Sequence, residues 1–174
     1  MITERKVTIP EGVNAEIIGS TLSVSGPKGK IERNMHYPNV NIKIEEGEFV
    51  VSTESTRKKI TAMLGTYASH AKNMCRGVTE EYVYTMKVVY SHFPIQLKTS
   101  GNKLEIANFL GEKESRFAEI PEGVKIKISG DEITLTGINK EMVGTASGRI
   151  ERATKVRGRD SRVFQDGIYI VNKA

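Results

Sequence analysis

The sequence predicts an α+β protein with two tandem domains, each an antiparallel β-sheet packed on one α-helix. Two observations predict this fold class. Hairpin-like segments recur in the same order in both halves of the chain, and each half contains one stretch in which apolar residues have helical spacing. An antiparallel sheet has an apolar face that such a helix can cover. We therefore expect an N-terminal repeat at residues 1–80 and a C-terminal repeat at residues 81–174.

One cassette of the sequence occurs twice without gaps. Residues 9–26 read IPEGVNAEIIGSTLSVSG and residues 120–137 read IPEGVKIKISGDEITLTG, with eight of 18 positions identical. Apolar and polar residues alternate on both sides of a glycine, Gly19 or Gly130, which is typical of a β-hairpin. This match, at an offset of 111 residues, predicts a similar hairpin in each half.

A second match has lower identity but extends further along the chain. Residues 40–44 pair with 124–128 at an offset of 84, and residues 63–66 pair with 142–145 at an offset of 79. The matched segments keep the order hairpin, hairpin, helix and require only small gaps. We interpret this second match as the domain duplication, and the 111-residue match as a similar turn used at two different places.

The strands are expected where alternation is strongest. In the first half we place them at residues 6–9, 13–18, 21–26, 29–35, 40–45 and 48–52. In the second half we place them at residues 81–91, 95–99, 103–108, 117–120, 124–129 and 132–137.

The helices are expected where apolar residues recur three and four positions apart. The first stripe consists of Ile60, Met63, Leu64, Tyr67, Ala71, Met74 and Cys75, with Thr53, Ser55 or Thr56 as the N-cap and Gly77 as the end. The second stripe consists of Met142, Val143, Ala146, Ile150 and Ala153, with Asn139 as the N-cap. A basic glycine turn is expected after each helix, at Arg76-Gly77 and Arg157-Gly158.

Composition favours a protein of a reducing, aqueous compartment. Cys75 is the only cysteine, so no internal disulfide can form. The N-terminus lacks the apolar core of a signal peptide, and no stretch reaches the roughly 18 apolar residues of a membrane span. We expect a cytoplasmic protein without a membrane partner.

No catalytic or metal-binding pattern is present, so we expect no enzyme activity, metal or cofactor. His36, His70 and His92 are far apart, and neither Cys-x-x-Cys, His-Glu-x-x-His nor an EF-hand pattern occurs. The glycine segments 26–30 and 144–149 lack the spacing of a nucleotide-binding P-loop. Gly144 and Gly148 are one helical turn apart, which would allow a backbone, of the sheet or of RNA, to approach the helix closely.

The basic residues are concentrated near the C-terminus. The chain has a net charge of +5, and residues 139–162 hold seven basic side chains against three acidic ones. Beyond the second helix the basic residues alternate with small or polar ones, and an apolar pattern resumes at Val163. Guanidinium groups bind phosphate oxygens in a bidentate manner, so this segment indicates an RNA-binding surface, although a solvated charged segment would have the same composition. The candidate RNA-binding residues are Lys140, Arg149, Arg152, Lys155, Arg157, Arg159 and Arg162.

Several blocks taken together resemble a known family. They are Ile9-Pro10-Glu11-Gly12-Val13, Gly26-Pro27-Lys28-Gly29, Tyr90-Ser91-His92-Phe93-Pro94-Ile95, Asn108-Phe109-Leu110-Gly111-Glu112-Lys113 and Asp166-Gly167-Ile168-Tyr169-Ile170. In this order they resemble large-subunit ribosomal protein six, in its archaeal and eukaryotic branch. The resemblance implies two sheet-plus-helix domains and binding of large-subunit ribosomal RNA mainly by the C-terminal half. It also implies a place near the sarcin–ricin loop and the base of the factor-recruiting stalk.

The leading hypothesis is therefore a structural constituent of the large ribosomal subunit that supports translation. Its expected partners are large-subunit rRNA and neighbouring ribosomal proteins, and no homo-oligomer is required. The alternative hypothesis is a tandem protein-interaction module that is not bound to RNA. Such a module would explain the duplication, and its partner binding would be insensitive to salt.

Overall fold

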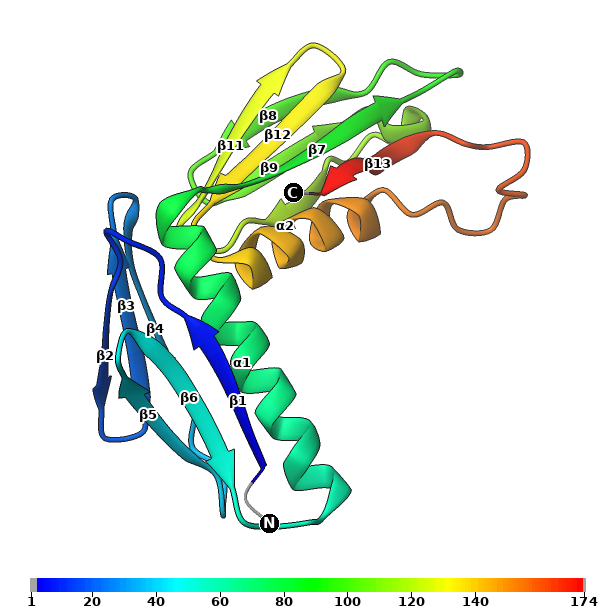
Figure 1. The fold of residues 1–174 in the computed structure, drawn as a ribbon. Helices are drawn as coiled ribbons and strands as arrows, with labels where there is room; N and C mark the ends of the chain where they lie inside the picture. The colour runs from blue at the N-terminus through cyan, green and yellow to red at the C-terminus, as the bar shows by residue number, and fades with distance from the viewer. Residues whose placement is uncertain (1–2, 174) are drawn as a thin grey trace. The chain divides into compact units, whose positions relative to one another are not determined.

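The computed structural model describes residues 3–173. The chain forms two compact units, of which the first ends at Glu81 and the second begins at Tyr82. Figure 1 shows the helices and strands of both units.

The first unit contains two three-stranded antiparallel sheets and one helix. One sheet has the order β1-β6-β5 and the other β2-β3-β4, and α1 packs against β1 and β6 of one and against β3 and β4 of the other. The elements are β1 (Thr3–Thr8), β2 (Asn14–Ile18), β3 (Thr21–Gly26), β4 (Gly29–Asn34), β5 (Asn41–Glu45), β6 (Glu48–Thr53) and α1 (Lys58–Thr79).

The second unit repeats this arrangement with one additional strand. Its sheets have the orders β10-β9-β8 and β11-β12-β7-β13, and α2 packs against strands of both. The elements are β7 (Tyr82–Val89), β8 (Gln96–Ser100), β9 (Lys103–Ala107), the 3-10 helix η1 (Phe109–Gly111), β10 (Arg116–Glu119), β11 (Val124–Ser129), β12 (Glu132–Gly137), α2 (Lys140–Ala153) and β13 (Gly167–Lys173).

The strand orders decide between the two sequence matches. β5 and β6 hold the same places beside β1 as β11 and β12 hold beside β7. The match at an offset of 84 joins β5 to β11, so the interpretation of that match as the duplication is confirmed. The 111-residue match joins the β2–β3 hairpin to the β11–β12 hairpin, which occupy different sheets within their units. The fold class is confirmed too, except that each unit has two small sheets where one was expected.

The first helix differs from its sequence prediction at both ends. Arg57 occupies the N-cap position and its side chain makes no capping hydrogen bond, so Thr53, Ser55 and Thr56 were wrong as N-cap predictions. The Thr53 hydroxyl donates to the Asn39 carbonyl, and the Ser55 hydroxyl accepts from the amide of Arg57 itself. Gly77 does not end the helix, which continues to Thr79. The expected Arg76-Gly77 turn is therefore wrong. Gly77 and Val78 are buried, and their packing against the rest of the unit favours continuation of the helix.

The second helix agrees more closely with the sequence. The Asn139 side chain accepts a hydrogen bond from the Glu141 amide at 3.0 Å, so the predicted N-cap is confirmed. Val143, Ala146 and Ile150 are fully buried, but Met142 is 43% exposed and was wrongly included in the apolar stripe. Ser147 takes its place on the buried face, where its hydroxyl donates to the Gly144 carbonyl.

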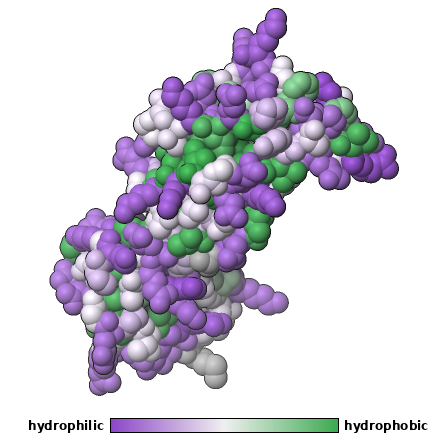
Figure 2. All heavy atoms as spheres, turned by 90° about the horizontal axis from the view of Figure 1, so that it is seen from above, coloured by the Kyte–Doolittle hydropathy of each residue, from purple (hydrophilic) through white to green (hydrophobic). Residues whose placement is uncertain are grey.

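Each unit has its own apolar core between its helix and its sheets. Leu22, Val51 and Leu64 are almost completely buried in the first unit, and Met86, Leu135 and Ile150 are completely buried in the second. Burial raises the pKa of the Cys75 thiol, which packs in the first core as predicted. The face drawn in Figure 2 is mostly hydrophilic, with apolar residues gathered in a few areas.

Gly26, the last residue of β3, is required by close packing. A Cβ atom at this position would lie 2.8 Å from the Val78 side chain and 2.9 Å from the Val78 carbonyl oxygen. The same helix end accepts a hydrogen bond from the Lys28 amide at 3.0 Å. The Gly26-Pro27-Lys28-Gly29 turn is thus a structural contact with α1.

Neither α1 nor α2, the α-helices of residues 3–173, is long and apolar enough to span a membrane. In the same residues, no three His, Cys, Asp or Glu side chains come together as a metal ion would require.

Candidate nucleic-acid interface

The predicted RNA-binding residues lie along α2 and on the loop that joins it to β13. This loop, residues 154–166, carries four of the seven candidates. It leaves the helix at Thr154 and returns to the sheet at Gly167, so the apolar pattern that resumes near the C-terminus corresponds to a strand, β13. We call residues 154–166 the basic loop.

Four of the seven candidates have partners within the second unit. The Lys140 ammonium lies 5.7 Å from the centre of the Tyr82 ring, and Arg149 donates to the Glu119 carbonyl at 3.3 Å. The Arg159 guanidinium lies 4.7 Å from the centre of the Phe164 ring. Arg162 bonds to both carboxylate oxygens of Asp160, although its side chain is 89% exposed. These four cationic side chains therefore already make contacts within the protein.

The other three candidates, Arg152, Lys155 and Arg157, gather at one place. Among the described residues, none of their side chains has an ion pair or hydrogen bond, and all three are exposed. They line a shallow hollow of about 340 Å³ together with Arg116, Phe117 and Ala153. No carboxylate of residues 3–173 lines this hollow, which we call the cationic hollow. Its positive charge is therefore available to a polyanion.

Arg116, at the start of β10, fixes the first end of the basic loop. Its guanidinium donates to the carbonyl oxygens of Ala153 and Lys155, at 2.8 and 3.3 Å. It also binds both carboxylate oxygens of Glu112, at 2.8 and 2.6 Å, and lies 4.4 Å from the centre of the Phe109 ring. The hydrogen bond from Arg116 holds the pKa of Glu112 below its ordinary value. The sequence did not single out Arg116, because the loop carbonyls that it binds are distant in the chain.

Thr154 joins the end of α2 to the beginning of β13. Its buried hydroxyl lies 3.4 and 3.3 Å from the carbonyl oxygens of Ile150 and Glu151, and it accepts a hydrogen bond from the Ile168 amide at 3.0 Å. The hydroxyl thus satisfies a buried amide of β13 and holds the two ends of the basic loop together.

Asp166 fixes the second end of the basic loop. Its carboxylate is 1% exposed and accepts hydrogen bonds from the Ser91 amide and hydroxyl and from the His92 amide, between 3.1 and 3.4 Å. The His92 Nδ1 atom lies 3.2 Å from the same carboxylate. Burial acts to raise the pKa of Asp166, but these hydrogen bonds outweigh it and hold the pKa below its ordinary value.

An aromatic stack holds the basic loop near its second end. The Phe164 ring stacks on the His92 ring with centroids 5.0 Å apart, and Arg159 lies over the Phe164 ring. The loop is therefore held at Thr154, Phe164 and Asp166, so its cations are presented on an ordered backbone. A freely solvated charged segment, the alternative left open by composition, would show no such contacts.

The cluster of Ser91, His92 and Asp166 is not a catalytic triad. Both the Ser91 hydroxyl and the Asp166 carboxylate lie 3.2 Å from the same ring nitrogen, Nδ1. A triad requires the carboxylate on one ring nitrogen and the nucleophile on the other. The cluster is a structural tie between the segment after β7 and the end of the basic loop.

The helix glycines are open on the side away from the core. Apart from the backbone of α2 itself, a Cβ atom at Gly144 or Gly148 would have no heavy atom within 4 Å, so neither glycine is needed for approach of the sheet. Of the two backbones that the sequence left open, the sheet is therefore excluded.

Comparison with known proteins agrees with this architecture. A family model described as "Ribosomal protein L6" matches residues 9–81 and 93–167, one match in each unit. The chain belongs to the ribosomal protein L6 family. Membership in a family of ribosomal proteins makes it a structural protein and not an enzyme.

Relatives in this family match along almost the whole chain. The "Large ribosomal subunit protein uL6" of Methanospirillum hungatei is 55% identical over 174 residues, which cover 100% of this chain and 99% of the relative. The protein of the same name from Methanosarcina mazei is 50% identical over 170 residues, which cover 98% and 97%. The resemblance to the archaeal branch of the L6 family is thus confirmed.

Proposed function

We propose that this L6-family chain is a structural constituent of the large ribosomal subunit and binds large-subunit rRNA through the second unit. The observation that carries the proposal is the cationic hollow, where Arg152, Lys155 and Arg157 have no ion pair within residues 3–173 and lie beside a loop fixed at both ends. The names of the relatives, which describe large-subunit proteins, support the assignment to that subunit.

The chemistry of the hollow favours phosphate as its ligand. Guanidinium groups bind phosphate oxygens with charge-assisted hydrogen bonds, and a lysine adds a compact positive charge. Lys140, Arg149, Arg159 and Arg162 extend the positive surface. Arg149 and Arg162 each face a carboxylate, whereas Lys140 and Arg159 lie over aromatic rings and keep their full charge. The predicted seven residues thus become three central contacts and four flanking ones. By family resemblance, the RNA bound is the region of the sarcin–ricin loop and the stalk base.

Salt-dependent binding tests this proposal. The probe is an in vitro transcript of Methanospirillum hungatei large-subunit rRNA, and the variant replaces Arg152, Lys155 and Arg157 with glutamine. Each phosphate contact contributes about 0.7 to 0.9 to the slope of log K against log salt, so the slope should become shallower by about 2 to 3. Affinity at low salt should fall by at least about tenfold.

A matched control uses the three exposed cations at the start of α1, Arg57, Lys58 and Lys59. Their replacement with glutamine removes the same charge from the first unit and should leave the slope unchanged. Equal slopes for the wild type and the variant of the cationic hollow would contradict the proposal. Salt-insensitive binding of another protein by that surface would favour the interaction module instead.

A further inference from the structure

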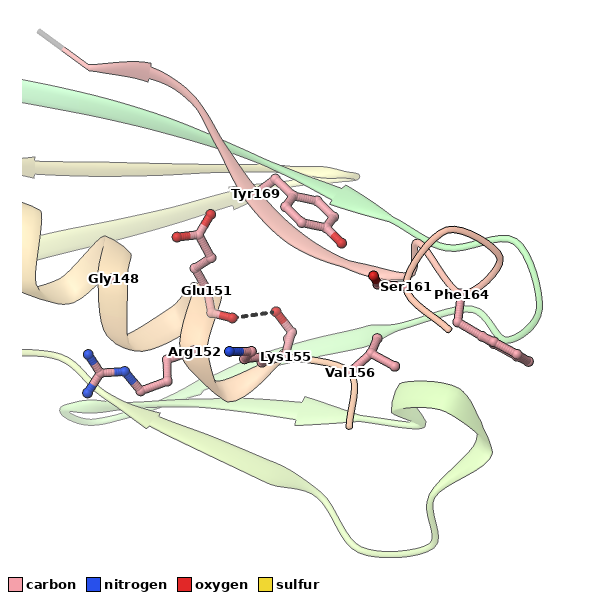
Figure 3. A pocket seen from close by; sticks show the side chains of 9 residues that line it. Gly148, Glu151, Arg152, Lys155, Val156, Ser161, Phe164 and Tyr169 are labelled. Carbon is pink, nitrogen blue, oxygen red and sulfur yellow. Dashed lines mark hydrogen bonds between the residues drawn. The ribbon is translucent and has the colours of Figure 1, made fainter. Parts of the chain in front are cut away.

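A second hollow shares Arg152 and Lys155 with the cationic hollow and is lined by the end of α2, the basic loop and β13. Its volume is about 510 Å³, and Gly148, Val156, Phe164 and Tyr169 are among its lining residues. In Figure 3, Tyr169 reaches in from β13, while Lys155 and Val156 lie across from it just past α2. We call it the aromatic hollow, defined by Gly148, Glu151, Val156, Ser161 and Tyr169 together with the two shared cations.

We propose that the aromatic hollow takes an unstacked nucleobase of the bound RNA. This inference rests on the proposed function, since it places a base beside the phosphates of the cationic hollow. It differs from that function in kind, because phosphate contacts position an RNA and a base contact reads a particular nucleotide.

The aromatic side chains suit a base. The Tyr169 residue is 43% exposed, and its hydroxyl is held by a hydrogen bond to the Gln165 carbonyl at 3.0 Å. The ring is therefore fixed in place while much of its surface remains open. Stacking of a base on such a ring stabilises RNA binding by about 1–3 kcal/mol, and unpaired nucleotides are the usual targets of sequence-specific RNA recognition.

The charge of the lining distinguishes a base from a phosphate. Glu151 lines the aromatic hollow, whereas no carboxylate of the described residues lines the cationic hollow. A carboxylate repels a phosphate but accepts hydrogen bonds from the amino group of a base. The two hollows share Arg152 and Lys155, so a nucleotide placed with its base in one hollow has cations beside it for its own phosphate or the next.

The open face of α2 gives the base its space. Gly148 lines the aromatic hollow, and a Cβ atom there would meet no protein atom within 4 Å apart from the backbone of α2 itself. Glycine lowers helix stability by about 1 kcal/mol relative to alanine. A larger residue would improve the helix and fill the hollow. Gly65 in α1 has open space as well, so the position of Gly148 in the lining of the hollow is what makes its open space usable by a base.

Filling the hollow without harming the fold tests the inference. Gly148→Leu adds a side chain in the hollow and should raise helix stability, and Tyr169→Ala removes the stacking surface. With the same large-subunit rRNA transcript, each variant should bind about 5- to 150-fold more weakly, from the stacking range above. The salt slope should stay at its wild-type value, because no phosphate contact is removed. Tyr169→Phe should recover most of the affinity lost in Tyr169→Ala. Gly65→Leu makes the same change in α1, where Gly65 also has open space, and should bind like the wild type.

A fluorescence measurement adds a direct readout. The chain contains no tryptophan, so Tyr169→Trp introduces a single one whose emission should be quenched when a base stacks on it. Ile18→Trp, at an exposed position of the first unit, is the control and should change less.

The outcomes separate this inference from the proposed function. Wild-type affinity in both Gly148→Leu and Tyr169→Ala, alongside weaker binding of the cationic-hollow variant, overturns the base site and leaves the phosphate site standing. A shallower salt slope in Tyr169→Ala assigns the hollow to a phosphate and overturns the base site as well. Wild-type affinity and a wild-type salt slope in the cationic-hollow variant would overturn the proposed function.

Discussion

The two units have the same scaffold but differ in the segment after the helix. In the first unit, α1 ends at Thr79 and the chain passes through Glu80 and Glu81 directly into β7. In the second unit, α2 is followed by the 13-residue basic loop and by β13, which adds a fourth strand to the sheet of β7. The duplicated elements supply most of the core, to which β13 adds Ile168. The part without a counterpart carries four of the seven candidate RNA-binding residues, and α2 carries the other three.

Charge is divided between the units in the same way. Residues 1–81 contain 11 Lys and Arg against 10 Asp and Glu, whereas residues 82–174 contain 15 against 11. Within residues 3–81 no loop carries a run of cations like that of the basic loop. The candidate RNA surface therefore combines cations of α2, an element present in both copies, with those of a loop that only one copy has.

The largest expected effect concerns the two cores. Leu64 in α1 and Ile150 in α2 are both fully buried, so replacement of either by alanine should lower the free energy of unfolding of its own unit by about 2–5 kcal/mol. Hydrogen exchange in the native state should show faster exchange in β1–β6 and α1 for Leu64→Ala, and in β7–β13 and α2 for Ile150→Ala. Equal acceleration along the whole chain in both variants would mean that the units unfold as one.

A smaller effect is expected at two threonines that hold similar places at the ends of the helices. Thr154→Val leaves the buried Ile168 amide without its acceptor, which should cost about 1–3 kcal/mol. Thr79 in α1 donates to the Cys75 carbonyl one turn earlier and links no second element, so Thr79→Val should cost less than about 1 kcal/mol. Urea denaturation of the two variants measures the difference. A similar loss in both would show that the link between α2 and β13 adds nothing to the second unit.

Local sequence patterns predicted most of the scaffold. Alternation placed twelve strands near their observed positions, and the domain duplication was recognised from residues 40–44 and 124–128 because strand pattern and order agree there. The N-cap at Asn139 was predictable because a cap is a local interaction. The apolar segment after Val163 signalled a packed element, although its place beside β7 was not assigned.

Long-range contacts account for the features that the sequence did not predict. The end of α1 was misplaced because Gly77 is buried there, and tertiary packing outweighs a local tendency to end a helix. The seven basic residues were found from composition, but only the folded chain separates Arg152, Lys155 and Arg157 from those with partners. Arg116 and Asp166 were missed as anchors, since the groups that they hold lie between 37 and 75 residues away.

Anchoring of the basic loop at Arg116 should matter for RNA binding. Arg116→Met removes the donor to the Ala153 and Lys155 carbonyls and leaves Glu112 without its partner. Because the Arg116 side chain is 26% exposed, water can replace part of these bonds, and we expect a loss of about 1–2 kcal/mol in stability. RNA affinity should fall further than in Lys127→Met, which removes one exposed charge from β11 of the same unit. Equal affinities of the two variants would mean that the loop needs no anchor at Arg116.

The smallest expected effect is the response of the second anchor to acid. The pKa of Asp166 is held below its ordinary value, so its contribution to stability is complete above the ordinary aspartate pKa of about 3.9 and is lost as the pH falls through the lower, folded-state value. Urea denaturation from about pH 6 to about pH 3 should therefore show a steeper loss of stability in the wild type than in Asp166→Asn. Asp131→Asn, at an exposed carboxylate of the same unit, should follow the wild type. If stability fell equally with pH in Asp166→Asn and in the wild type, the charge of Asp166 would not contribute to anchoring the loop. The basic loop would then depend on Arg116, Thr154 and the Phe164 stack to hold its cations for RNA.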